Sequence, residues 1–354
     1  MIHRKKIIRI WILTSLIIFS ICSIPTISIN PELPLQNILL HNIISTSGDD
    51  SPLIINGNLD LASQASEGNG TVSNPYIIQN KQIDAGGNGT CILIQNTNKY
   101  FTLKNCSLRN SRGAYPNNVG IYLKNVTLGY IVNNTIYNCF YGILLYYCKN
   151  NKIENNSISY GSAGINSWSS YKNQFLRNNL HKNHSGIAFY ESNKNSIINN
   201  TASENTYGFY IDYYNDDNII VGNSGNNNND TGLLLGWDSQ NNTLKNNIFN
   251  YNKIYGILLW NGVHNNTLIS NTVNDNKYGI YLYYASYNDI EWNTLINNEF
   301  GIFQQPEDGG NIIQNNLRQD KIHIDFNFLF IELGVICAVG IILLMWKAKR
   351  LKLW

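Results

Sequence analysis

Three acidic side chains stand at similar places in neighbouring segments of the sequence: Glu191, Asp212 and Asp238. Glycoside hydrolysis uses two carboxylates about 5 to 9 Å apart, one as the acid and the other as nucleophile or base. If these segments stack in register, adjacent ones provide that spacing, so the three are the candidate catalytic residues. The alternative is that they are solvated surface carboxylates. A lyase is not indicated, because it needs a basic proton acceptor and no Arg stands at these positions.

Aromatic residues occupy equivalent positions, four or five places after a recurring glycine. Flat amphipathic rings suit sugars, which present both an apolar face and hydroxyl groups. Stacked rings on a solvent-facing sheet that serve only to stabilise it are the alternative. The candidate ligand-binding residues are Tyr146, Trp168, Tyr190, Asp212, Trp237, Trp260 and Tyr283.

Metal-binding patterns are weak. His181 and His184 lie three residues apart, and imidazoles are copper ligands, but turn histidines are usually just exposed. The Asn- and Asp-rich run over residues 215–230 offers oxygen ligands for Ca²⁺ without the nonapeptide pattern of calcium-binding β-rolls. No cofactor is therefore predicted, and Cu and Ca remain the alternatives.

These residues belong to a repeat of about 22 residues. A glycine recurs at positions 120, 142, 164, 186, 208, 232, 256, 279 and 301, with Cys91 in the same place at the start of the series. An asparagine follows at 105, 134, 156, 178, 200, 223, 246, 271, 293 and 315. A short period with two extended segments per unit is typical of a solenoid, whose units bury their apolar faces by stacking.

The residue types favour strands. The first and third residues after each glycine are apolar, as in Ile121/Leu123 and Ile143/Leu145, and period-two alternation turns them inward. The recurring Asn can hydrogen-bond to the coils on either side, and the Gly suits a positive φ or a close backbone approach. Leucine-rich repeats would need Leu at several fixed positions, so the sequence predicts an all-β parallel β-helix of about ten coils.

Four cysteines fall within or beside these coils: Cys91, Cys106, Cys139 and Cys148. They allow up to two disulfides with three connectivities, or they are small buried residues. No CxxC pair indicates zinc or redox chemistry.

The two ends of the chain are basic and apolar. An apolar run behind a basic cluster predicts a signal peptide or signal anchor over residues 1–29, followed by a linker over 30–50. The apolar run from Phe328 to Trp346 predicts a transmembrane helix over 326–346, and the basic tail, 347–354, should stay cytoplasmic. Residues 51–90 are expected to form an N-terminal cap and lead-in coil before the repeats of 91–325, and this middle part is expected to be extracytoplasmic.

The charge distribution argues against nucleic acid as a partner. The chain carries a net charge of +2, but four cationic residues near each end account for eight positive charges, which leaves the middle at about −6. Nucleic-acid binding needs a basic patch.

The segment "GNGTVSNPYIIQNKQIDAGGNGTCILIQNTNKYFTLKNCSLRNS" and the coils of "YGIxL" with "N.I..N.I" resemble right-handed parallel β-helix proteins of the pectin-lyase-like class. More narrowly, they resemble the NosD-type β-helix repeat family, which is associated with periplasmic copper binding. The resemblance covers residues 51 to about 318. It implies the fold, but lyases, hydrolases, adhesins and copper-site maturation factors all use such repeats.

The sequence therefore indicates a membrane-anchored extracytoplasmic β-helix that binds carbohydrate or a surface protein, with no demonstrable catalytic site. A polysaccharide-active hydrolase or lyase on the aromatic outer face, and a NosD-like accessory factor for a copper enzyme, are the alternatives.

Overall fold

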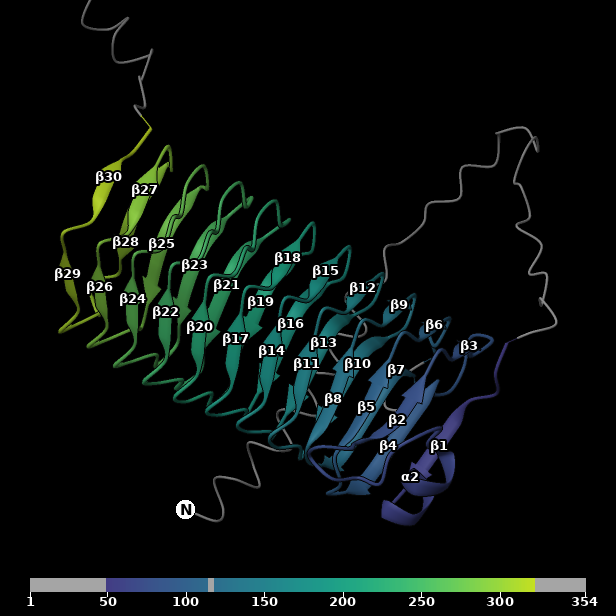
Figure 1. The fold of residues 1–354 in the computed structure, drawn as a ribbon. Helices are drawn as coiled ribbons and strands as arrows, with labels where there is room; N and C mark the ends of the chain where they lie inside the picture. Colours follow the sequence, from purple (N-terminus) through teal and green to yellow (C-terminus); the bar gives the residue numbers. More distant parts are fainter. Residues whose placement is uncertain (1–48, 114–117, 322–354) are drawn as a thin grey trace, which may run out of the picture. The chain divides into compact units, whose positions relative to one another are not determined.

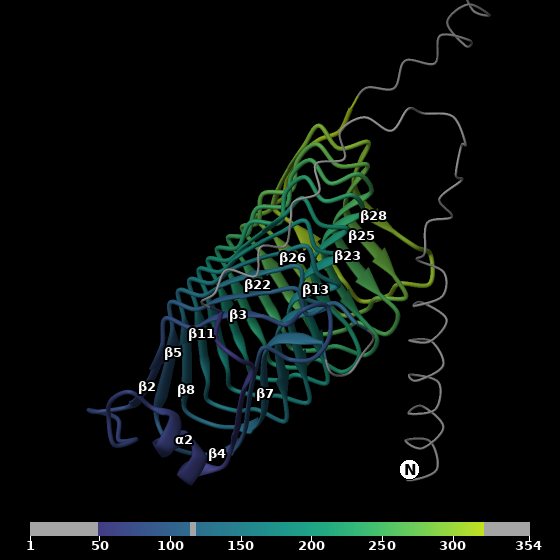
Figure 2. The same ribbon diagram turned by 90° about the vertical axis from the view of Figure 1, so that its right-hand side faces the viewer.

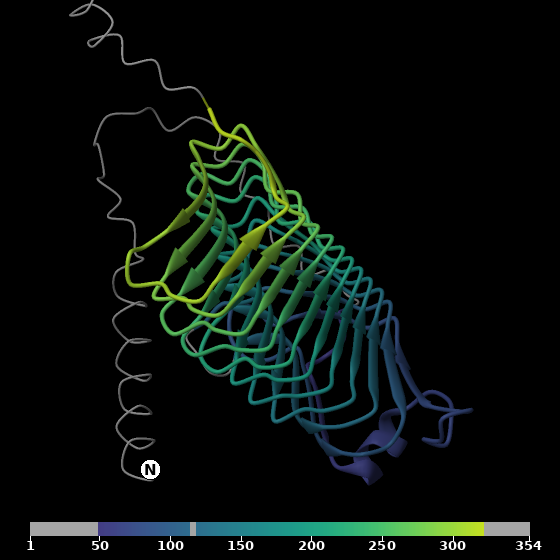
Figure 3. The same cartoon turned by 90° about the vertical axis from the view of Figure 1, so that its left-hand side faces the viewer.

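The structure is a computed structural model, which describes residues 49–113 and 118–321. Parallel strands stack into three ladders, because each coil contributes one strand to each ladder and its neighbours supply the hydrogen bonds (Figure 1). The sequence prediction of an all-β parallel β-helix is confirmed. Figures 2 and 3 show the stack from two further sides, running from the purple N-terminal coil to the yellow C-terminal strands.

Sheet A contains the glycine-led strands and has the order β1, β4, β7, β10, β13, β16, β19, β21, β23, β25, β28. Their bounds are Leu53–Asn56, Ile92–Thr97, Val119–Val126, Tyr141–Tyr146, Ala163–Trp168, Ser185–Tyr190, Tyr207–Ile211, Thr231–Gly236, Tyr255–Trp260, Tyr278–Tyr283 and Phe300–Gln304.

Sheet B contains the second strand of each coil, in the order β2, β5, β8, β11, β14, β17, β20, β22, β24, β26, β29. Their bounds are Tyr76–Gln79, Phe101–Lys104, Gly129–Val132, Lys152–Glu154, Gln174–Leu176, Ser196–Ile198, Ile219–Val221, Thr243–Lys245, Thr267–Ile269, Asp289–Glu291 and Ile312–Gln314.

Sheet C contains the third strands β3, β6, β9, β12, β15 and β18, and a separate pair, β27 and β30. Their bounds are Gln82–Asp84, Ser107–Arg109, Thr135–Tyr137, Ser157–Ser159, Asn179–His181, Thr201–Ser203, Thr294–Ile296 and Leu317–Gln319. Single bridges through Ser224, Ile248 and Thr272 connect β18 to β27, so the third ladder runs through all the intervening coils.

The first coil, β1 to β3, lies at the N-terminal end of the stack together with α2 (Asn58–Gln64). Leu61 of α2 is fully buried in the core. Burial of that side chain against the first coil removes apolar surface from water at an end that would otherwise stay open.

The interior is filled by the inward apolar residues that the sequence predicts. Ile121, Leu123, Ile143 and Leu145 are fully buried, and the equivalent residues of later coils join them in one core cluster. The recurring glycine is required by close approach rather than by a positive φ. A Cβ at Gly142 would lie 2.3 Å from Ile158 and 2.5 Å from the carbonyl oxygen of Gly164 in the next coil.

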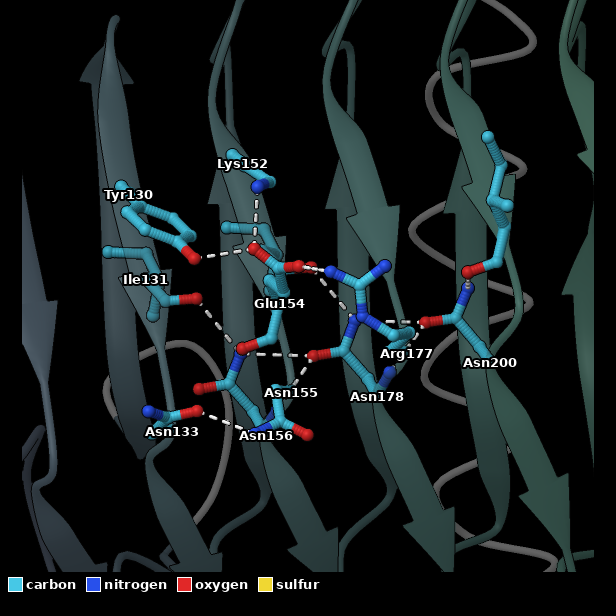
Figure 4. Close-up of polar contacts among 12 residues, drawn as sticks. Tyr130, Ile131, Asn133, Lys152, Glu154, Asn155, Asn156, Arg177, Asn178 and Asn200 are labelled. Atoms are coloured by element: carbon cyan, nitrogen blue, oxygen red, sulfur yellow. Dashed lines mark hydrogen bonds and ion pairs between the residues drawn. The ribbon is translucent and has the colours of Figure 1, made fainter.

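Asparagine ladders line the corners of the coils, and there are three of them where the sequence analysis expected one. Figure 4 shows part of the central ladder: the Asn178 side chain donates to the Ile153 carbonyl and to Asn200 Oδ1, and its own Oδ1 accepts from the Asn156 amide. The other two ladders run from Asn151 to Asn311 and from Asn183 to Asn298.

Three members predicted for the central ladder are wrong by one residue. Asn105, Asn246 and Asn315 are exposed, and each adopts a positive φ close to 55°. The next residue turns inward instead: Cys106, Asn247 and Asn316 hold the ladder positions. Asn tolerates the left-handed region better than most residues, so the first Asn of a doublet makes the turn and the second one enters the ladder.

The predicted signal or anchor segment (1–29), most of the linker (30–50), the membrane helix (326–346) and the basic tail (347–354) lie outside the described residues. Within the part of the chain that the structure describes, no helix is both long and apolar enough to cross a bilayer.

Candidate functional site

The outer face of sheet A carries a second apolar cluster, separate from the core. Tyr141, Leu144, Ala163 and Ala188 are buried in it, and Trp168, Tyr190 and Tyr210 pack against them. A solvent-facing side of a sheet is normally polar. The apolar character of this face is therefore unusual, and it makes the face the candidate binding surface.

Aromatic rings on this face contact one another from coil to coil, and we call this series the aromatic strip. Trp168 stacks on Tyr190 with ring centroids 4.3 Å apart, and Tyr213 stacks on Trp237 at 5.5 Å with the rings 5° from parallel. Trp237 meets Trp260 edge to face at 5.9 Å. Four of the predicted ligand-binding residues thus lie in one strip, and Tyr213 connects Tyr190 to Trp237.

Towards the C-terminal coils the strip surrounds a hollow with a volume of about 360 Å³, which we call the aromatic hollow. Two predicted residues, Trp260 and Tyr283, line it. Tyr284, which stands five places after its glycine, lines it too. The remaining lining residues were not singled out in the sequence: Tyr255, Leu258, Asn261 and Tyr281.

The missed rings stand at two further outward positions of the repeat. Tyr255 immediately precedes its glycine, and Tyr281 is the second residue after its own. Their rings stack on each other at 5.3 Å. A search for aromatics at every outward position, rather than only four or five places after the glycine, would have found them.

Tyr146 lies at the N-terminal end of the same face, where it is the register partner of Trp168 and packs on Tyr147 with ring centroids 4.3 Å apart. It extends the predicted set by one coil in that direction.

Asp212 follows β19 directly and is almost fully buried, with 1% of its surface exposed. Burial raises the pKa of this carboxyl to about 7, against the opposing effect of two hydrogen bonds. The Tyr210 hydroxyl donates to Oδ2 at 2.9 Å and the Tyr213 amide donates to Oδ1 at 3.1 Å. At the equivalent place in the next coil stands Gly236, where a Cβ would come within 2.5 Å of Oδ1.

The other two candidate carboxylates lie in turns around a different tyrosine. Glu191 and Asp238 both have a positive φ, and Glu191 accepts a hydrogen bond from Ser169 at 3.1 Å. Burial raises the pKa of Tyr214, and its hydrogen bond to Asp238 and the nearby Glu191 add to that shift. Among the described residues, no hydrogen bond joins Asp212 to Glu191 or to Asp238.

The two candidate metal ligands differ in their position in the coil and in their burial. His181 ends β15 and is half-buried, whereas His184 follows in the turn, is exposed and packs beside Tyr207; the desolvation caused by its neighbours lowers the pKa of its imidazole. Over residues 49–113 and 118–321, no three His, Cys, Asp or Glu side chains form a group that would hold a metal ion. In the run of residues 215–230, the asparagines that point inward belong to the corner positions and ladders: Asn215, Asn218, Asn223 and Asn228.

The four cysteines of the described coils are buried free thiols. Cys106 and Cys148 point back to main-chain carbonyls, with Sγ 3.4 Å from the Lys104 oxygen and 3.3 Å from the Leu123 oxygen. Cys91 and Cys139 also point to main-chain carbonyls, with Sγ 3.7 Å from the Arg109 oxygen and 3.5 Å from the Tyr137 oxygen.

A charged cluster on sheet B was not singled out in the sequence (Figure 4). Glu154 is 4% exposed and accepts from the Tyr130 hydroxyl at 2.5 Å, from Lys152 at 2.6 Å and from Arg177. Because these donors come from three successive coils and occupy both carboxylate oxygens, the cluster fastens the coils together. Tyr130 and Lys152 are register partners on β8 and β11, and Glu154 stands two residues after Lys152 on the same face. This 22-residue and two-residue spacing is the signal that could have revealed the cluster.

Comparisons with known proteins agree with this architecture. Residues 119–273 match the family model of the right handed beta helix region. The described coils therefore form a right-handed parallel β-helix, as the resemblance to the pectin-lyase-like class implies. The match concerns the β-helix itself and leaves the narrower NosD-type resemblance a prediction.

Among solved structures, the A-module of the mannuronan C-5 epimerase AlgE6 from Azotobacter vinelandii is similar, with a TM-score of 0.56 and 16% identity over 71% of this chain and 77% of that one. ORF18 of Geobacillus virus E2 has a TM-score of 0.52 and 14% identity, over 73% of this chain and 56% of that one. Both likenesses show the fold. No curated protein matches the sequence.

Proposed function

We propose that the protein binds an extended polysaccharide along the outer face of sheet A, with the aromatic hollow as its principal subsite. The observation that carries the proposal is the hollow itself, in which four tyrosines and a tryptophan surround about 360 Å³ on one face of the rod. Sugar rings stack on such side chains through their apolar faces.

The polar groups of the hollow suit the hydroxyl groups of a sugar. Asn261 supplies an amide that both donates and accepts. The Tyr281 hydroxyl accepts from Gln305 Nε2 at 2.8 Å, which fixes its ring in place. A rigid, partly apolar recess with a few convergent polar groups is the usual form of a small-ligand site.

The repeat extends this subsite into a track. Successive coils repeat at about 4.8 Å, and the aromatic strip continues from the hollow through Trp237 and Tyr213 to Tyr190 and Trp168. A ligand with a repeating chain fits a surface with a repeating structure. The similar fold of a mannuronan epimerase module supports a polysaccharide as the ligand class.

The proposal includes attachment to a membrane through the apolar segment over residues 326–346, with the coils on the extracytoplasmic side, as the sequence predicts. A surface protein is the other partner that the sequence allows, and the experiment below separates it from a polysaccharide.

The experiment is affinity electrophoresis of the full chain in detergent, through gels that contain acidic or neutral polysaccharides. Trp260→Ala and Tyr283→Ala remove rings from the hollow, while Tyr287→Ala removes a 68% exposed ring that does not line it. We expect retardation by at least one polysaccharide, lost in the first two variants and kept in the third. Absence of retardation in every gel would redirect the search to protein partners.

A second function, cleavage or modification of the bound polysaccharide, is favoured by Asp212. A carboxyl with a pKa of about 7 stays partly protonated at neutral pH and is suited to general acid catalysis. New reducing ends or unsaturated products in the same samples would establish it, provided that Asp212→Asn forms no product and is still retarded. Products formed equally by Asp212→Asn would exclude this residue from catalysis.

A further inference from the structure

We propose that Cys91 and Cys139 form a disulfide bond when the chain folds in an oxidising compartment. The sequence leaves three connectivities open for the four cysteines of the coils, and the structure favours this pair.

Two neighbouring coils bring these thiols together. Cys91 Sγ lies 3.7 Å from the carbonyl oxygen of Arg109, and Cys139 Sγ lies 3.5 Å from that of Tyr137. Arg109 and Tyr137 are register partners on the adjacent strands β6 and β9. The two sulfur atoms therefore sit against the same corner of the stack, one coil apart, and are close enough for each thiol to influence the ionisation of the other.

The other two thiols of the described coils lack such a partner. Cys106 points back to the carbonyl of Lys104, and Cys148 points to those of Leu123 and Tyr146. Among the described residues, no other thiol influences the ionisation of either one. Since disulfide formation requires close sulfur atoms, these two cysteines serve as matched controls.

The oxidant is a disulfide, either of a thiol oxidoreductase or of oxidised glutathione. The thiolate of one of the two cysteines attacks one of its sulfur atoms, forms a mixed disulfide and releases one thiol. The other cysteine then loses its proton and attacks the sulfur atom of the first, which releases the second thiol. Two electrons and two protons pass to the oxidant, and one disulfide replaces another. Because both side chains are buried in the finished rod, the exchange takes place while the coils assemble.

The test is refolding of the full chain in a glutathione redox buffer with detergent, followed by denaturation in an alkylating reagent without reductant and peptide mapping by mass spectrometry. The chain has six cysteines. We expect one cross-linked pair of peptides, containing residues 91 and 139, and alkylation of the other four cysteines.

Two variants and one unfolded control sharpen the result. Cys106→Ser/Cys148→Ser should keep the cross-link, and Cys139→Ser should lose it and leave Cys91 alkylated. The same oxidation in urea gives the pairing expected without a fold. Alkylation of all six cysteines, another connectivity, or equal yields of the 91–139 cross-link in folded and unfolded chains would overturn the proposal.

Discussion

The interior of the coils and the outer face of sheet A follow the same 22-residue period but use it in opposite ways. Inside, one position repeats the same kind of residue: Ile121, Ile143, Ile165 and Ile187 are all fully buried. On the outer face, the residue four places after the glycine is Lys124, Tyr146, Trp168, Tyr190, Asp212, Gly236, Trp260, Tyr283 or Gln305.

The difference shows which requirement acts on each surface. Each interior residue must fit against its copies in the coils on either side, because close-packed cores leave little room for change. The outer face also has contacts from coil to coil, but it is not enclosed on both sides, so its residues are freer to vary. Its large aromatic residues and its buried acid therefore reflect what the face contacts rather than how the coil closes.

The largest expected effect concerns Asp212, a residue of the outer face that should lower the stability of the fold rather than add to it. Asp212 has a pKa of about 7 in the folded chain, above its unfolded value of 3.8. The folded state thus binds the proton more tightly, and the stability from this group is complete below about pH 4 and lost as the pH rises towards 7. The loss amounts to about 4 kcal/mol.

We therefore expect Asp212→Asn to reduce the fall in the urea midpoint between pH 4.5 and pH 8, and to be more stable than the wild type at pH 8. Asp217→Asn changes an acid whose side chain is 45% exposed and is the control. Equal pH profiles for Asp212→Asn and the wild type would mean that the carboxyl carries no such cost.

A polar residue of the interior should add stability, whereas Asp212 on the outer face should lower it. Asn178 is 1% exposed and makes hydrogen bonds to Ile153, Asn156 and Asn200. Asn178→Ala leaves these groups unpaired in the core and should lower the free energy of unfolding by about 3 kcal/mol. Urea denaturation measures it, with the exposed Asn229→Ala as the control. If both variants lost the same stability, the ladder would have no special role.

The recurring glycine offers a smaller effect of the same kind. Gly142→Ala forces a methyl group against Ile158 and the Gly164 carbonyl, whereas Gly309→Ala places it in open space. We expect a loss of about 2 kcal/mol in the first variant and little change in the second. A neutral Gly142→Ala would show that the coils separate easily.

The smallest effect on stability is expected in the aromatic strip. Trp237 is 37% exposed and stacks on Tyr213, so Trp237→Ala should lower the free energy of unfolding by about 1 kcal/mol or less. The same variant should weaken retardation by the polysaccharide. A large loss of stability with unchanged retardation would assign the strip to structure alone.

The fold and the inward residues could be predicted because stacking imposes one period on the whole chain. The details at the corners of the coils could not be predicted. In the doublets at Asn246 and Asn315, either residue could enter the ladder, and only the left-handed φ of the first one decides. The hollow could be predicted in part, since Trp260, Tyr283 and Tyr284 stand four or five places after their glycines, whereas Tyr255 and Tyr281 occupy other outward positions of the same strands. The proximity of Cys91 to Cys139 depends on how two coils stack, which residue spacing does not specify.

Calorimetric titration of the full chain with oligosaccharides of the retarding polysaccharide tests the central claim most directly. We expect Trp260→Ala to weaken binding by roughly tenfold or more, the loss of about 1.4 kcal/mol, and Tyr287→Ala to bind like the wild type. Equal affinities in the wild type and both variants would contradict the assignment of the aromatic hollow as the polysaccharide-binding site.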